Sequence, residues 1–135
     1  MRDNQWLAKR LEWLWRTYFA DVPVSNEVIV RFGRSARTRL GSIKFGKRKI
    51  NPRSYITLTG LFRDEQVPDY VVDAVLAHEL THYAHGFHSP HSRLYRHPHA
   101  QGVVTKELTA RGLGAIVREQ KRWLKKNWPK FIRDY

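Results

Sequence analysis

Hydrophobic side chains recur at helical spacing near the start of the chain. Leu7, Leu11, Leu14 and Tyr18 lie three or four residues apart, so they form one apolar stripe of an amphipathic helix over residues 4–19. Tryptophans beside the stripe widen it, and a proline shortly afterwards ends the helix. We expect this helix to pack on the core of the protein.

The pattern then changes from helical spacing to alternation. Apolar and polar side chains alternate over residues 24–32, 40–45 and 55–59, which is typical of β-strands with one buried face. Segments rich in glycine and basic residues separate these stretches. The pattern predicts a short sheet of three or four mainly antiparallel strands.

A strongly apolar segment follows the last strand. Its hydrophobic residues fall at helical spacing from Val71 to Tyr83, and Gly86 stands where a helix would end. We therefore predict a core helix over residues 69–85. Two prolines and many polar side chains then indicate a loop over residues 86–102.

Helical spacing returns in the last third of the chain. Apolar residues recur over residues 103–126, where Gly112 and Gly114 can bend or break the helix. The final stretch, residues 123–135, combines lysines with aromatic side chains. We expect those aromatic side chains to pack on the domain and the lysines to face solvent.

The order of these elements predicts an α+β fold in a single domain over residues 1–135. Its parts are an N-terminal helix, a short sheet, the central helix and C-terminal helices. A length of 135 residues, 41% of them hydrophobic, suits one core. No apolar run approaches the roughly 20 residues of a membrane span, and the first residues carry several charges, so we expect a cytoplasmic protein with no membrane partner.

The charge of the chain is strongly positive. Lys and Arg number 25 against 12 Asp and Glu, which gives a net charge of +13. Residues 31–53 hold nine basic residues and no acid, and residues 118–133 hold seven with only Glu119 against them. These two blocks favour contact with a polyanion, above all with nucleic acid.

The central helix carries the sequence His78-Glu79-Leu-Thr-His82, a His-Glu-x-x-His motif. Residues four apart share one face of a helix, so His78 and His82 can bind one metal ion. Glu79 lies beside the first ligand, where its carboxylate can reach a metal-bound water. Because the chain has no cysteine, a metal here must use histidine and carboxylate ligands, which predicts catalytic Zn²⁺ with Glu79 as general base.

A catalytic zinc needs a third protein ligand. His85 lies a full turn beyond His82 and beside the end of the helix, so one ion is not expected to reach it. The remaining candidates are Glu107 and the four histidines of the loop. Those histidines are His88, His91, His97 and His99.

Three segments resemble the SprT-like zinc metallopeptidase superfamily, including its short YgjP-type and Spartan-like members. Residues 39–42, Arg-Leu-Gly-Ser, resemble the Arg-Trp-Gly-Ser turn of that family, with Leu40 in place of Trp. Residues 68–82 resemble its active-site helix. Residues 91–95, His-Ser-Arg-Leu-Tyr, resemble the His-Gly/Ser-x-x-aromatic element that supplies its third zinc ligand. The resemblance covers residues 28–114.

This resemblance implies a small zincin-like fold that hydrolyses peptide bonds by a zinc-bound water. It implies that Zn²⁺ is held by His78, His82 and His91. His88 and Glu107 remain alternatives to His91, the latter because gluzincin peptidases take their third ligand from a downstream helix. The partner would be a protein or peptide substrate, and the basic blocks together with the resemblance favour a substrate on or near DNA.

Two rival functions stay open from the residues. One is a basic nucleic-acid-binding module with a structural or vestigial zinc site, and the other is a zinc hydrolase of a non-peptide substrate. For a peptidase, we expect the strand at residues 40–45 to pair with an extended substrate. Tyr83, Tyr95 or a loop histidine are candidates to stabilise the oxyanion.

Overall fold

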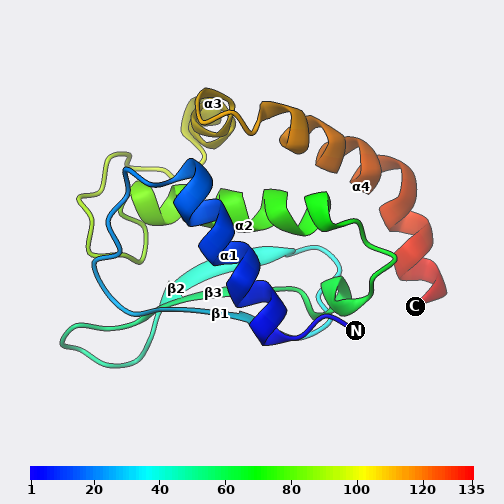
Figure 1. Ribbon diagram of the computed structural model, residues 1–135, viewed down its shortest axis with the longest axis horizontal. Helices are drawn as coiled ribbons and strands as arrows, with labels where there is room; N and C mark the ends of the chain where they lie inside the picture. Colours follow the sequence, from blue (N-terminus) through cyan, green and yellow to red (C-terminus); the bar gives the residue numbers. More distant parts are fainter.

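The computed structural model, which describes residues 1–135, contains four α-helices and one three-stranded sheet (Figure 1). This architecture confirms the α+β class, with the predicted N-terminal, central and C-terminal helices. The elements in chain order are α1 (Asn4–Tyr18), β1 (Val28–Phe32), β2 (Gly41–Phe45), β3 (Ser54–Leu58), η1 (Gly60–Arg63), α2 (Asp69–Ala84), η2 (Ala100–Gly102), α3 (Val103–Ala110) and α4 (Gly114–Asp134).

The sheet is mixed, whereas the sequence predicts a mainly antiparallel one. Its strand order is β1-β3-β2, in which β3 runs parallel to β1 and antiparallel to β2. The link after β1 carries the chain to the far edge of the sheet, so the hairpin from β2 returns β3 into the middle. Alternation of side chains reports which face is buried, but it contains no information on strand direction.

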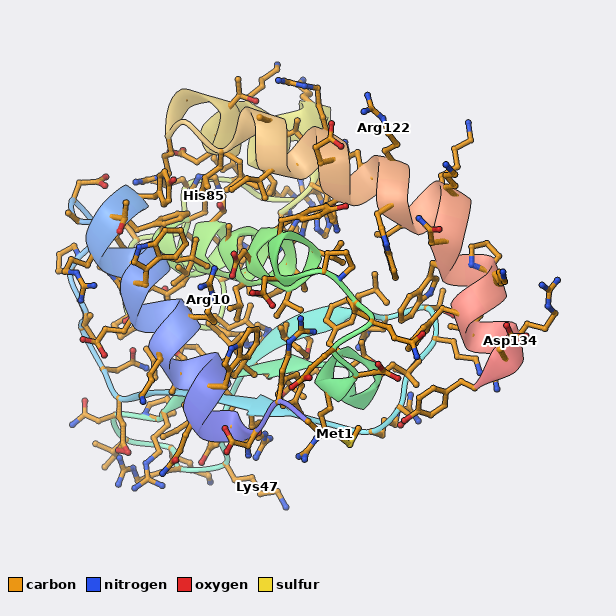
Figure 2. The ribbon with its side chains drawn as sticks, turned by 45° about the vertical axis from the view of Figure 1, so that its right-hand side comes forward. Met1, Arg10, Lys47, His85, Arg122 and Asp134 are labelled. Carbon is orange, nitrogen blue, oxygen red and sulfur yellow. The ribbon has the colours of Figure 1, made fainter.

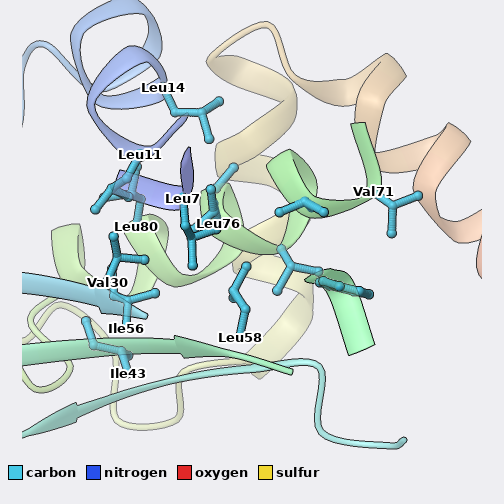
Figure 3. Close-up of a cluster of buried hydrophobic side chains, with 14 of the residues drawn as sticks. Leu7, Leu11, Leu14, Val30, Ile43, Ile56, Leu58, Val71, Leu76 and Leu80 are labelled. Atoms are coloured by element: carbon cyan, nitrogen blue, oxygen red, sulfur yellow. The ribbon is translucent and has the colours of Figure 1, made fainter. Parts of the chain in front are cut away.

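The core lies between α2 and one face of the sheet. Side chains from α1, α2 and all three strands meet there, among them Leu11, Val30, Ile43, Ile56 and Leu76 (Figure 3). On its other side α2 packs against α3 and α4, so most of its residues are buried. This arrangement explains why the segment lacks a polar stripe: a helix enclosed on every side is apolar all round.

The end of α2 is closed by a glycine. Gly86 has φ +84°, and the N–H groups of Gly86 and Phe87 donate to the carbonyls of Tyr83 (3.1 Å) and His82 (2.9 Å). This is a Schellman motif, in which a left-handed residue satisfies the last carbonyls of a helix. A Cβ on Gly86 would lie 2.5 Å from the carbonyl oxygen of Ser92, so the loop after α2 folds back tightly on the helix end.

The C-terminal helix α4 covers α2 and reaches the loop after β1. Gly112, with φ +89°, separates α3 from α4. Trp128 is buried, its Nε1 donates to the carbonyl of Arg37 at 2.9 Å, and its ring contacts Phe62. The lysines of α4 are exposed, as expected. None of the helices has both the length and the apolar character needed to cross a membrane.

Candidate metal centre and cleft

Three histidines meet at the side of α2. His78 and His82 lie one turn apart on α2 with their Nε2 atoms 3.0 Å apart, and the loop before α3 brings Nε2 of His99 to 3.1 Å from both. Three nitrogens around one tetrahedral zinc at 2.0–2.1 Å would lie roughly 3.3 Å from one another. The cluster is therefore a group of residues that could hold a metal ion.

This triangle of nitrogens cannot be satisfied by protons alone. Each Nε2 of a neutral imidazole either donates or accepts a hydrogen bond. With three atoms in mutual contact and only two states, at least one of the three contacts joins two donors or two acceptors. A cation bound by all three lone pairs would remove this conflict.

Burial keeps the two helical histidines neutral. It lowers the pKa of His78 to about 4, with smaller contributions from the charges of His99 and Lys121. Burial also lowers the pKa of His82 to about 3, helped by its histidine neighbours. A metal ligand must be an unprotonated imidazole, so both residues are ready to bind at neutral pH.

The carboxylate of Glu79 lies beside the start of β2. It is buried, and a Cβ on Gly41 would lie only 3.0 Å from its Oε2, so the absence of a side chain there makes room for the carboxylate. Burial raises the pKa of Glu79 to about 8, and the charge of Arg39 opposes that rise. The carboxylate forms no ion pair within the protein, which leaves it available to a bound molecule.

His78 and Glu79 line a cleft of about 360 Å³. One wall is formed by Arg39 and Leu40, which precede β2, and by Gly41, its first residue. The other wall is formed by α3 and α4, including Lys121. The cleft therefore joins a candidate metal ligand, a carboxylate and two cationic side chains from distant parts of the chain.

His91 does not lie in the histidine cluster, which differs from the expectation for the third ligand. Its Nε2 donates to the carbonyl of Pro23 at 2.7 Å, and its ring packs edge-on against Tyr83 at 5.1 Å. His91 thus ties the loop to the segment after α1. The loop histidine that lies beside His78 and His82 is His99.

The two alternative ligands are also placed elsewhere. His88 is exposed and packs against Phe45. Glu107 contacts Nε2 of the buried His85 at 3.1 Å and accepts from Arg111 at 3.0 Å. The sequence included His99 among the loop candidates but offered no reason to prefer it, because only the path of the loop decides which histidine arrives.

The two tyrosines considered for the oxyanion also have other contacts. The hydroxyl of Tyr83 donates to Asn26 at 2.7 Å and accepts from the backbone N–H of Ser25 at 3.0 Å. The ring of Tyr95 packs against His85. Neither tyrosine lines the cleft.

The face of the sheet that lies away from the helices carries a basic hollow of about 300 Å³. Arg34, Arg39 and Lys44 line it together with the hydroxyls of Ser42 and Thr57, and no acid does. Lys47 and Arg122, one from each basic block, lie on opposite sides of the molecule (Figure 2). Arg39 and Lys121, also one from each block, line the same cleft.

The chain matches no family model, no curated protein and no solved structure.

Proposed function

We propose that this protein is a zinc-dependent metallopeptidase in which His78, His82 and His99 hold Zn²⁺ and Glu79 is the general base. The observation that carries the proposal is the triangle of Nε2 atoms at 3.0–3.1 Å, which a shared cation would satisfy. The resemblance of residues 39–42 and 68–82 to SprT-like metallopeptidases supports the same assignment.

The donor set favours zinc. Three neutral imidazoles with no thiolate are a common ligand set of catalytic zinc, which keeps a further position open for water or substrate. His78 also lines the cleft, so a space large enough for part of a substrate lies beside the histidine cluster. A structural zinc would instead be closed by a fourth protein ligand.

When bound, Zn²⁺ would polarise the scissile carbonyl and acidify the attacking water. Glu79 accepts the proton of that water on its carboxylate and delivers it to the leaving amine. The pKa of about 8 for Glu79 belongs to the protein without a cation. A nearby positive charge lowers this pKa, so that at neutral pH the carboxylate is ionised, as a general base must be. Its lack of an ion-pairing partner leaves the carboxylate available for this transfer.

The position of β2 supports a peptide as substrate. β2 is an edge strand, because its only neighbour in the sheet is β3. It begins at Gly41, which abuts Glu79. An extended chain that pairs with the free edge would therefore pass beside the candidate general base.

The direct test is the variant Glu79→Gln. We expect it to bind one zinc per chain, measured by atomic emission, and to lose about 100-fold or more in peptide hydrolysis, because an amide cannot accept the proton. Glu119→Gln on the exposed face of α4 is the matched control and keeps full activity. Unchanged hydrolysis by Glu79→Gln would rule out the proposed mechanism.

The basic hollow on the open face of the sheet favours a second candidate function, nucleic-acid binding. Arg34 and Lys44 line the hollow but not the cleft, so their replacement by glutamate separates the two functions. The double variant is expected to weaken binding to single-stranded DNA and to reduce its salt dependence, measured by fluorescence anisotropy, while peptide hydrolysis persists. Equal DNA affinity in both proteins would exclude this surface.

A further inference from the structure

Two cationic side chains, those of Arg39 and Lys121, line the cleft beside Glu79. Arg39 and Lys121 are exposed and form no ion pair. Some arginines of the chain form ion pairs, such as Arg53 with Glu27 at 3.0 Å, whereas others, such as Arg34 and Arg37, form none. The position of Arg39 and Lys121 distinguishes them from the other unpaired basic residues, because they line the same concave surface as His78 and Glu79.

Arg39 and Lys121 approach the reactive groups from opposite walls. Arg39 lies two residues before Gly41, which abuts Glu79, and Lys121 lies on α4 across the cleft. Apart from Glu79, every charged side chain that lines the cleft is positive. Because Glu79 acts in proton transfer, the positive charges of Arg39 and Lys121 are available to interact with a bound substrate.

A substrate carboxylate is more complementary to these two positive charges than a neutral group is. Arginine presents a planar fork of donors that matches a carboxylate, and lysine adds a second positive charge. A neutral substrate would partly desolvate both cations without pairing them, which costs free energy. A cleft of about 360 Å³ has room for an aspartate or glutamate side chain with its backbone.

We propose that the cleft selects peptides that carry a carboxylate next to the scissile bond, bound by Arg39 and Lys121. This inference rests on the proposed peptidase function and assigns its substrate class. The carboxylate has two possible sources in the substrate, an Asp or Glu side chain or the free C-terminus.

Zinc-loaded, full-length protein and matched fluorogenic peptides test the proposal. The first set of peptides has both ends blocked and carries Glu, Gln or Lys beside the scissile bond, so it tests the effect of a side-chain carboxylate. The second set carries Gln beside the scissile bond and ends there in a free or an amidated C-terminus, so it tests the effect of the terminal carboxylate. We expect kcat/KM for a carboxylate peptide to exceed that of its neutral counterpart about 10-fold, and the advantage to shrink at high salt. The peptide set in which the higher kcat/KM occurs identifies whether the side chain or the C-terminus supplies the carboxylate.

Charge reversal of one wall gives the decisive comparison. Lys121→Glu is expected to cut kcat/KM for the carboxylate peptide about 10-fold. It should also raise kcat/KM for the Lys peptide relative to kcat/KM for the Gln peptide. Lys125→Glu, four residues further along α4 and outside the cleft, should keep the selectivity of the original protein.

The Gln peptide distinguishes the two possible failures. If no peptide is cleaved at all, the peptidase function is wrong and this inference falls with it. If the Gln peptide is cleaved but Glu, Gln and Lys peptides react equally, or Lys121→Glu leaves a carboxylate preference unchanged, the inference alone is overturned.

Discussion

At the scale of single residues, the identity of the third histidine decides what the centre can do. His78 and His82 are brought together by one turn of helix, whereas His99 arrives from a loop and completes a face of three nitrogens. His91 has instead a structural contact with the carbonyl of Pro23. The two loop histidines therefore predict opposite phenotypes.

Replacing His99 by alanine should weaken zinc binding about 100-fold or more, because it removes one of three ligands. His91→Ala is the matched control, which should keep zinc affinity and lose some stability. Competition with a chromophoric chelator measures both affinities. A loss of zinc in His91→Ala with none in His99→Ala would return the third position to His91.

The pH dependence of the metal-free protein is also a property of single residues. Burial raises the folded-state pKa of Glu79 to about 8, so the folded protein holds a proton that the unfolded chain has released, and stability falls as pH rises to that value. The pKa values of His78 and His82 are lowered to about 4 and about 3. For them stability falls as pH drops below about 6.5, the usual histidine value.

The metal-stripped protein should therefore be most stable near about pH 6.5 and lose on the order of 1–2 kcal/mol by about pH 8. Urea unfolding in EDTA at the two pH values measures this loss. Glu79→Gln removes the titrating carboxyl, so its stability should change less over the same interval. The same loss in both proteins would show that another group is responsible.

At the scale of elements, the end of α2 determines where the histidine loop begins. The left-handed Gly86 closes the helix, and its missing side chain lets the backbone around Ser92 fold against it. Gly102 also has a positive φ, +67°, but no atom lies within 4 Å of the place where its Cβ would be. A side chain at Gly86 would therefore meet both backbone strain and a steric clash, whereas one at Gly102 would meet backbone strain alone.

Gly86→Ala should destabilise the protein by about 2–4 kcal/mol, because strain at positive φ adds to a clash with backbone atoms. Gly102→Ala should cost only about 1 kcal/mol, the strain by itself. Urea denaturation gives both free energies of unfolding. Equal costs at the two positions would mean that the loop moves freely away from Gly86.

At the scale of the whole molecule, the metal centre connects α2 to the loop that leads into α3. A ligand that binds only the folded protein stabilises it, and at 100 times its dissociation constant the gain is about 2.7 kcal/mol. For a chain of 135 residues this gain raises Tm by about 10 °C. The centre thus links zinc occupancy to global stability.

Zinc added to the metal-free protein should produce that rise in Tm in a thermal scan, and EDTA should reverse it. His82→Ala is expected to show little or no shift because the site has lost a ligand. Glu79→Gln should retain the shift, since the carboxylate is not a ligand. A shift of equal size in His82→Ala would point to zinc binding elsewhere on the protein.

The sequence by itself determined the main helices, the presence of a short sheet and the pairing of His78 with His82 on one face of α2. These features depend on spacing along a few turns of chain, where local geometry leaves little choice. The parallel pairing of β1 with β3, the arrival of His99 in place of His91, and the meeting of Arg39 with Lys121 across the cleft were decided only by the tertiary structure. Each of these joins segments whose separation depends on the path of a loop, and no local pattern of residues contains that path.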